Sequence, residues 1–187
     1  EVTDISALKS AVNLERINAK DNQIADISVL AGLQKLRWIA LENNCIRDIS
    51  CLKGLEALEC LRLNHNQITD ISALSGFPRL KDVWLENNQI TRVTDLTDLP
   101  ELSVLLLNQN QITSVHLSGW PKLWSFDLKD NQICDISLSD LPELGMLELD
   151  NNCITDVSGL TSLKDLYSLG LTGNPVENIE LLDFIPD

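Results

Sequence analysis

The sequence predicts an α/β-type repeat solenoid with a parallel β-sheet on its concave side and 3₁₀ or extended backbone on its convex side. Three observations predict it: an asparagine that recurs at a nearly constant spacing, a leucine pattern that leads into it, and apolar residues spaced by about three after it. Self-similarity at a period of about 20 to 50 residues determines the architecture before any single element is assigned. We therefore expect one elongated domain.

The recurring asparagine returns every 21 or 22 residues along the whole chain. Its side chain carries donors and an acceptor, so it can bond the backbone of its own turn and of neighbouring turns. We expect a structural ladder that satisfies buried peptide groups. Its members are Asn22, Asn44, Asn66, Asn88, Asn110, Asn131, Asn152 and Asn174.

Each asparagine lies near the end of the pattern L-x-x-L-x-L-x-x-N-x-I, as in the segment from Leu36 to Ile46. Apolar residues alternate around Ile39 and Leu41 with the period of two that is typical of a strand. Residues 1–13 match only the outer half of a repeat. Residues 14–187 are expected to hold eight repeats, which begin at Leu14, Leu36, Leu58, Leu80, Leu102, Leu123, Leu144 and Leu166.

The outer half of each repeat has apolar residues at a spacing near three, which suits 3₁₀-like or extended backbone. A serine column there is expected to cap exposed backbone donors through its hydroxyls: Ser28, Ser50, Ser72 and Ser158. The aspartates two residues earlier are expected to form a solvated ridge. Two repeats lack one outer residue, at Val115 to Leu117 and Ile136 to Leu138, which should alter local curvature and leave the strand register intact.

The composition argues against several classes of partner and cofactor. The formal net charge of −14 argues against nucleic acid and anionic membranes as partners, and no apolar run reaches the roughly 18 residues that cross a bilayer. Five cysteines without a CxxC pair and two histidines argue against a zinc site, and we expect no cofactor. Cys134 and Cys153 lie in adjacent repeats but different columns, so a bridge between them would require distortion.

No base, nucleophile or metal ligands gather in the pattern, so we expect no enzyme; His65 and His116 are interpreted as solvated side chains. The concave face is different, because large apolar side chains occupy outward positions there. Exposed Trp and Arg are typical energetic anchors of protein interfaces. The predicted binding surface has a hot spot of Trp38, Arg62, Trp84 and Leu106, a charged rim of Asp82, Glu86, Asp127 and Glu148, and further members Val104, Trp124 and Met146.

Segments such as Asn22 to Leu30 and Asn66 to Leu74 resemble the 22-residue class of leucine-rich repeats, as found in bacterial internalins and in the regulatory leucine-rich repeat subunits of protein phosphatase. The resemblance implies a leucine-rich repeat horseshoe or arc. Similarity to internalins implies a cell-surface or secreted protein that binds a host receptor through its concave face. Similarity to the phosphatase regulators implies an intracellular protein.

Three functions stay open at this point, all with another protein as partner. The leading hypothesis is an internalin-like adhesion or interaction protein that binds its partner on the concave face. The second is an intracellular regulatory or inhibitory subunit that docks on an enzyme, which the odd number of cysteines favours because a free thiol suits the reducing cytoplasm. The third is a structural repeat segment of a larger assembly, with self-association through an open N-terminal edge.

Overall fold

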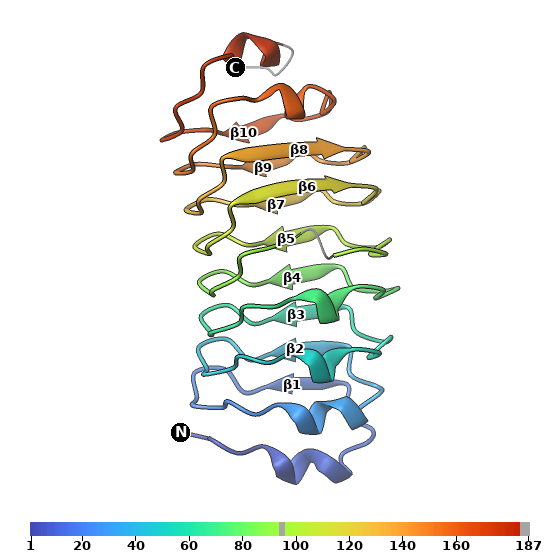
Figure 1. Cartoon of the computed structure of the whole chain (residues 1–187). Helices are drawn as coiled ribbons and strands as arrows, with labels where there is room; N and C mark the ends of the chain where they lie inside the picture. Colours follow the sequence, from blue (N-terminus) through green and yellow to red (C-terminus); the bar gives the residue numbers. More distant parts are fainter. Residues whose placement is uncertain (94–95, 184–187) are drawn as a thin grey trace.

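The repeats stack as successive turns of a solenoid along one axis, with the two termini at opposite ends (Figure 1). The structure is a computed structural model that describes residues 1–93 and 96–183. The last four residues of the predicted repeat segment lie outside the described residues. The predicted fold class is confirmed, because parallel strands, one per turn, form a sheet along one side.

The concave sheet has eight parallel strands in the order β1-β2-β3-β4-β5-β7-β9-β10. Each is three residues long, and equivalent residues of neighbouring repeats pair directly, as Ile17 does with Ile39 and Ile39 with Leu61. The alternation of the leucine pattern explains the strands: the middle residue points into the core and its neighbours point outward. Their bounds are β1 (Arg16–Asn18), β2 (Trp38–Ala40), β3 (Cys60–Arg62), β4 (Asp82–Trp84), β5 (Val104–Leu106), β7 (Ser125–Asp127), β9 (Met146–Glu148) and β10 (Ser168–Gly170).

The core is apolar from end to end of the stack. Leu61, Leu105 and Leu147, from the middle of three strands, are fully buried, as are the leucines and isoleucines of the outer turns that face them. Trp120, predicted to be a core residue, is buried and meets Phe126 edge to face with ring centroids 6.2 Å apart. Burial on this scale supplies the main free energy of folding, at about 25 cal/mol per Å² of apolar surface.

The asparagine column binds the turns together. Asn88 donates from Nδ2 to the carbonyls of Leu63 (3.1 Å) and Leu85 (3.0 Å), and its Oδ1 accepts from the N–H of Ile68 at 3.0 Å. Each of these contacts satisfies a buried backbone group of the same or the preceding turn. The same pattern recurs at Asn44, Asn66, Asn110, Asn131 and Asn152.

The residue before each of these asparagines adopts a left-handed backbone conformation. Its φ is 54° at Asn43, 56° at His65 and 53° at Asn87. Asparagine and aspartate tolerate this region better than most residues, which explains their frequency in the column. His65, interpreted from the sequence as a solvated side chain, therefore also occupies a turn position that constrains its backbone.

Five of the outer turns are 3₁₀ segments that begin with serine: η1 (Ser6–Ser10), η2 (Ser28–Gly32), η3 (Ser50–Leu52), η4 (Ser72–Leu74) and η5 (Ser158–Leu160); η6 (Ile179–Leu182) follows near the C-terminus. The predicted serine caps were wrong. In each of the five, the aspartate two residues earlier accepts the serine N–H, as Asp48 does from Ser50 at 2.8 Å. A carboxylate at this place forms an Asx-type turn, so these aspartates are structural as well as solvated.

The two shortened repeats differ on the convex side. There β6 (Ser114–Ser118) and β8 (Asp135–Ser139) form a second parallel sheet of two strands. Loss of one residue changes the apolar spacing from three to two, so Val115 and Leu138, like their partners, alternate inward. The concave register is unchanged across these repeats, as Val104 pairs with Ser125 and Ser125 with Met146. The prediction of an intact register is confirmed.

Just after each asparagine, the hydrogen bonds between adjacent turns join residues that occupy different positions in the repeat. The N–H one residue after it bonds the carbonyl two residues after the preceding asparagine, as Gln67 does with Ile46 and Cys153 with Ile133. Two columns that differ in the sequence pattern are therefore neighbours in space. Cys134 and Cys153, which occupy different columns, are therefore neighbours in adjacent turns.

Candidate protein-binding surface

The predicted surface residues lie on the concave sheet and just beside it. Trp38, Asp82, Val104 and Met146 occupy the first position of their strands. Arg62, Trp84, Leu106, Asp127 and Glu148 occupy the third position. In-register pairing places the members from β3 to β9 next to one another, with Trp84 beside Leu106 and Leu106 beside Asp127. Glu86 follows β4, and Trp124 precedes β7 and is 44% exposed.

Arginine and tryptophan side chains alternate over the first four strands. The guanidinium of Arg62 lies 4.0 Å from the ring centroid of Trp84 and 5.8 Å from that of Trp38, and that of Arg16 lies 4.8 Å from Trp38. We call Arg16, Trp38, Arg62 and Trp84 the Arg–Trp stack. Each cation–π contact contributes about 0.5 to 1 kcal/mol at a partly exposed site. Ala40 is only 1% exposed although it points to the concave side.

Arg16 was not among the predicted site residues. Its outward position in β1 follows from the same alternation that places Trp38, so the signal was present in the sequence. Its role depends on a contact between adjacent strands, and no pattern within one repeat shows that contact.

Among the described residues, neither Arg16 nor Arg62 takes part in an ion pair. The Nε of Arg62 is buried without a hydrogen-bond partner, as is Oε2 of Glu86. A buried polar atom without a partner costs about 1 to 3 kcal/mol, so the folded chain carries this cost at both atoms.

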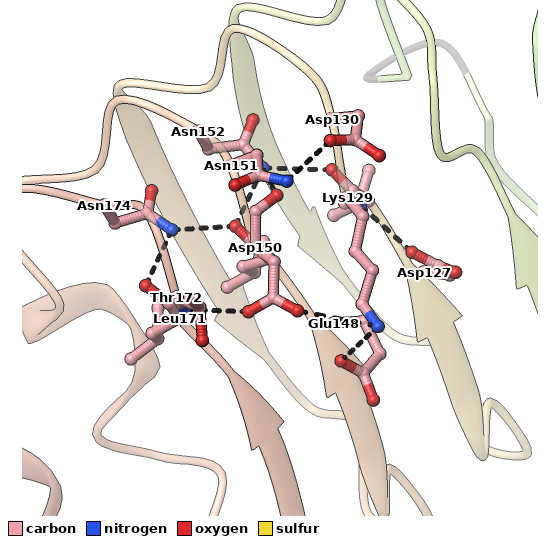
Figure 2. A network of polar contacts seen from close by, with 12 residues as sticks. Asp127, Lys129, Asp130, Glu148, Asp150, Asn151, Asn152, Leu171, Thr172 and Asn174 are labelled. Carbon is pink, nitrogen blue, oxygen red and sulfur yellow. Dashed lines mark hydrogen bonds and ion pairs between the residues drawn. The ribbon is translucent and has the colours of Figure 1, made fainter.

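The acidic residues at the C-terminal end of the surface have partners within the chain (Figure 2). Lys129 Nζ lies 3.0 Å from Glu148 and 3.5 Å from Asp150, and the Lys129 N–H donates to Asp127 at 3.0 Å. Asp150 in turn accepts the N–H of Thr172 at 2.7 Å. Glu148 is thus compensated internally, and Lys129 is a member of this end that the sequence did not predict.

Burial affects two carboxylates of the surface. Desolvation raises the pKa of Asp127 and that of Glu86 above their ordinary values. The hydrogen bond from Lys129 to Glu148 raises the pKa of the lysine, which keeps the lysine charged. The two ends of the surface therefore differ: cationic groups without counter-ions lie at β1 to β3, and partly neutralised acidic groups lie at β7 and β9.

A shallow pocket of about 360 Å³ lies at the edge of the Arg–Trp stack. Its outer wall consists of charged residues that precede the strands, and Arg37 and Lys81 both approach Glu59, at 2.6 and 4.0 Å. Trp38 and Asp82 line its inner side. The pocket lies between the stack and the residues that precede the strands, which we call the strand-entry edge. Trp124 lies on the same edge, further along the sheet.

Within residues 1–93 and 96–183, no three His, Cys, Asp or Glu side chains gather closely enough to hold a metal ion. In the same part of the chain, no helix has the length and apolar character needed to span a bilayer. His116 pairs with Asp135 at 3.0 Å on the convex sheet, far from the concave surface in its repeat.

The in-register sheet, the apolar core and the asparagine ladder define a leucine-rich repeat protein. A family profile described as leucine-rich repeats in two copies matches residues 56–101. Internalin C2 of Listeria monocytogenes is 30% identical with a TM-score of 0.73, and the alignment covers 97% of this chain and 72% of that one. The chain belongs to the internalin family of leucine-rich repeat proteins.

Other solved structures agree. An internalin of L. monocytogenes, InlF, is 27% identical over 97% of this chain and 61% of its own, with a TM-score of 0.75. A leucine-rich repeat protein of Leptospira interrogans is 26% identical over 98% of this chain and 51% of its own, with a TM-score of 0.85. The chain thus spans less than two thirds of these two proteins. A search of curated protein sequences finds no significant match.

Proposed function

We propose that this protein is an internalin-like interaction protein that binds a partner protein on its concave face and performs no chemistry of its own. The leucine-rich repeat fold is a typical scaffold for protein interactions, and likeness to two internalins supports the more specific role. The observation that carries the proposal is the Arg–Trp stack, in which two tryptophans and two arginines without counter-ions lie on one rigid sheet.

The stack has the properties of an interface anchor. Trp and Arg dominate the energetics of known interfaces, and a rigid sheet holds them without loss of conformational freedom on binding. Arg62 is half-buried and, among the described residues, takes part in no ion pair, so a carboxylate of the partner would supply its counter-charge. We propose Leu106, Val104 and Met146 as apolar contacts beside the anchor and Asp82, Glu86, Asp127 and Glu148 as its rim, with Trp124 at the strand-entry edge.

The test compares two variants that each carry two substitutions to alanine. Trp38→Ala with Trp84→Ala removes both rings of the stack, and Val12→Ala with Ile179→Ala removes two exposed apolar side chains outside the concave sheet, 55% exposed each. A partner captured by the natural protein from host and source-cell extracts is purified, and its affinity for each chain is measured by calorimetry. We expect the tryptophan variant to bind at least about 30-fold more weakly, which corresponds to about 2 kcal/mol, and the control variant to bind normally.

Circular dichroism on both variants separates loss of binding from loss of fold. Equal affinity of the two folded variants would exclude the concave stack as the binding site. Arg62→Lys refines the result, because lysine keeps the charge but loses the planar stacking on Trp84 and the bidentate hydrogen bonds.

A further inference from the structure

Two cysteines meet on the surface of the sixth and seventh repeats, away from the concave face. The N–H of Cys153 donates to the carbonyl of Ile133 at 2.8 Å, and that carbonyl belongs to the peptide bond that joins Ile133 to Cys134. Backbones paired in this way lie about 4.7 to 4.9 Å apart, within the range of roughly 4.4 to 6.8 Å between Cα atoms that a disulfide allows.

Both side chains point outward. Ile133 and Ile154 are fully buried, and the alternation along each segment turns Cys134 and Cys153 to the solvent, where both are exposed. Neighbouring residues of parallel segments project their Cβ atoms in the same direction. Desolvation raises the pKa of the Cys134 thiol, and the neighbouring Cys153 thiol raises it further. The two thiols therefore lie side by side and are accessible to reagents.

The other three cysteines lie in different surroundings. Cys51 and Cys60 are half-buried, and burial raises the pKa of Cys51 to about 11 and that of Cys60 in the same direction. Cys45 occupies the same column as Cys153, but its N–H bonds the carbonyl of Ile24, so its neighbour in the preceding turn is Ala25. Cys45 is thus a matched residue without a second thiol beside it.

We infer that Cys134 and Cys153 form a reversible redox site, a surface dithiol that low-molecular-weight disulfides such as oxidised glutathione convert into a disulfide between adjacent repeats. One thiolate attacks a sulfur of the oxidant, forms a mixed disulfide and releases one glutathione. The second thiolate then attacks the protein sulfur of that mixed disulfide and releases the second glutathione. The two protein thiols lose two protons and two electrons, and the electrons reduce the oxidant to two thiols.

The inference is independent of the proposed concave binding surface, because both sulfurs lie outside the sheet. The site joins consecutive turns of the solenoid, and its closed loop would hold 20 residues from Cys134 to Cys153. Oxidation would add a covalent cross-link between two turns that now contact through packing, hydrogen bonds and ion pairs.

The experiment incubates the folded, fully reduced chain with excess oxidised glutathione, blocks the remaining thiols with a maleimide and maps the disulfides by mass spectrometry. We expect two of the five thiols to disappear without a gain of glutathione, and one cross-linked peptide that contains Cys134 and Cys153. A reductant such as dithiothreitol should restore both thiols.

Single variants give the matched comparison. Cys134→Ser and Cys153→Ser should each retain one glutathione as a stable mixed disulfide, because no second thiol can displace it. Cys45→Ser should form the cross-link as the natural chain does. Separate glutathione adducts on Cys134 and Cys153 of the natural chain, or a cross-link to any other cysteine, would overturn the inference. The peptide map of the natural chain decides the question even if a variant folds poorly.

Discussion

At the scale of single residues, the asparagines contribute more than their small surface suggests. Each satisfies backbone groups of two consecutive turns, which neither strand pairing nor packing could satisfy at that place. The sequence predicted their spacing and their hydrogen-bonding role because the pattern repeats in every turn. It did not show the aspartate caps, because a serine and an aspartate two residues apart are equally plausible capping residues in a pattern without coordinates.

We expect Asn88→Ala to lower the free energy of unfolding by roughly 1 to 3 kcal/mol, because the change leaves the buried Ile68 N–H without a partner and removes one of the two amide donors to each of the Leu63 and Leu85 carbonyls. Urea denaturation followed by circular dichroism measures the loss. Gln89→Ala, at the exposed neighbouring position, is the control and should change stability by less than about 0.5 kcal/mol. Equal stabilities for the two variants would contradict the ladder.

The capping aspartates predict an acid dependence of stability. The backbone N–H of Ser50 holds the pKa of Asp48 below its ordinary value, and the serines that follow Asp26, Asp70 and Asp156 do the same there. A carboxyl whose pKa is lowered in the folded state stabilises fully above its unfolded pKa of about 3.9, and this contribution is lost as the pH falls through the folded pKa. Stability should therefore decline below about pH 4.

Asp48→Asn tests the contribution of one cap. The amide keeps an acceptor but does not titrate, so thermal unfolding between about pH 5 and pH 2 should depend less steeply on pH than in the natural chain. Ser50→Ala keeps the backbone N–H that is the main cause of the shift, so it should keep most of the pH dependence. Equal pH dependence in the two variants would show that the serine hydroxyl, rather than the backbone N–H, causes the shift.

At the scale of elements, the convex side shows where the sequence was informative and where it was not. The place of the missing residue was evident at Val115 to Leu117 and Ile136 to Leu138, and the unchanged concave register followed from it. The convex strands were not predicted. Their signal was present, since Ser-Val-His-Leu-Ser alternates with a period of two, but a pairing of β6 with β8 depends on two adjacent repeats having the same deletion.

Gly159 marks the contact between β8 and η5. A Cβ at this position would meet the carbonyl oxygen of Ile136 and lie 2.9 Å from the Cα of Ser137. Because both atoms belong to the backbone, Gly159→Ala should lower the free energy of unfolding by about 1 to 3 kcal/mol.

Gly32 provides the control, since a Cβ there meets no atom within 4 Å. Gly32→Ala should be neutral or stabilise by up to about 1 kcal/mol, through the reduced freedom of the unfolded chain. Chemical denaturation of both variants gives the comparison. Equal stabilities would mean that η5 moves away from β8 without cost.

At the scale of the whole molecule, charge and repetition act together. The fold class was predictable because every repeat carries the same sequence pattern. A departure from the pattern in one repeat therefore does not change the prediction for the others. The positions of the predicted surface residues on the concave strands were predictable residue by residue, but the contacts between their side chains were not. The pairing of Lys129 with Glu148 and Asp150 and the stacking of Arg62 on Trp84 join side chains of adjacent turns, which the pattern of one turn does not contain.

The net charge of −14 predicts that salt stabilises the fold. Repulsion among many carboxylates opposes the compact state, and added ions reduce its range to about 10 Å at 0.1 M and about 3 Å at 1 M. The melting temperature should therefore rise as sodium chloride increases over this range. A fall in melting temperature would mean that attractive pairs such as Lys122 with Glu101 outweigh the repulsion.

The register of the concave sheet also sets a length scale for any bound chain. Equivalent residues of neighbouring strands lie about 4.8 Å apart, whereas a helix advances about 5.4 Å per turn and alternate side chains of an extended segment lie about 6.7 Å apart. A helix laid along the solenoid axis loses about 0.6 Å of alignment per strand, and after about four strands it is half a repeat out of step. The Arg–Trp stack occupies β1 to β4. A helical partner can therefore match the stack along its whole length, but must bend or change conformation to continue across β5.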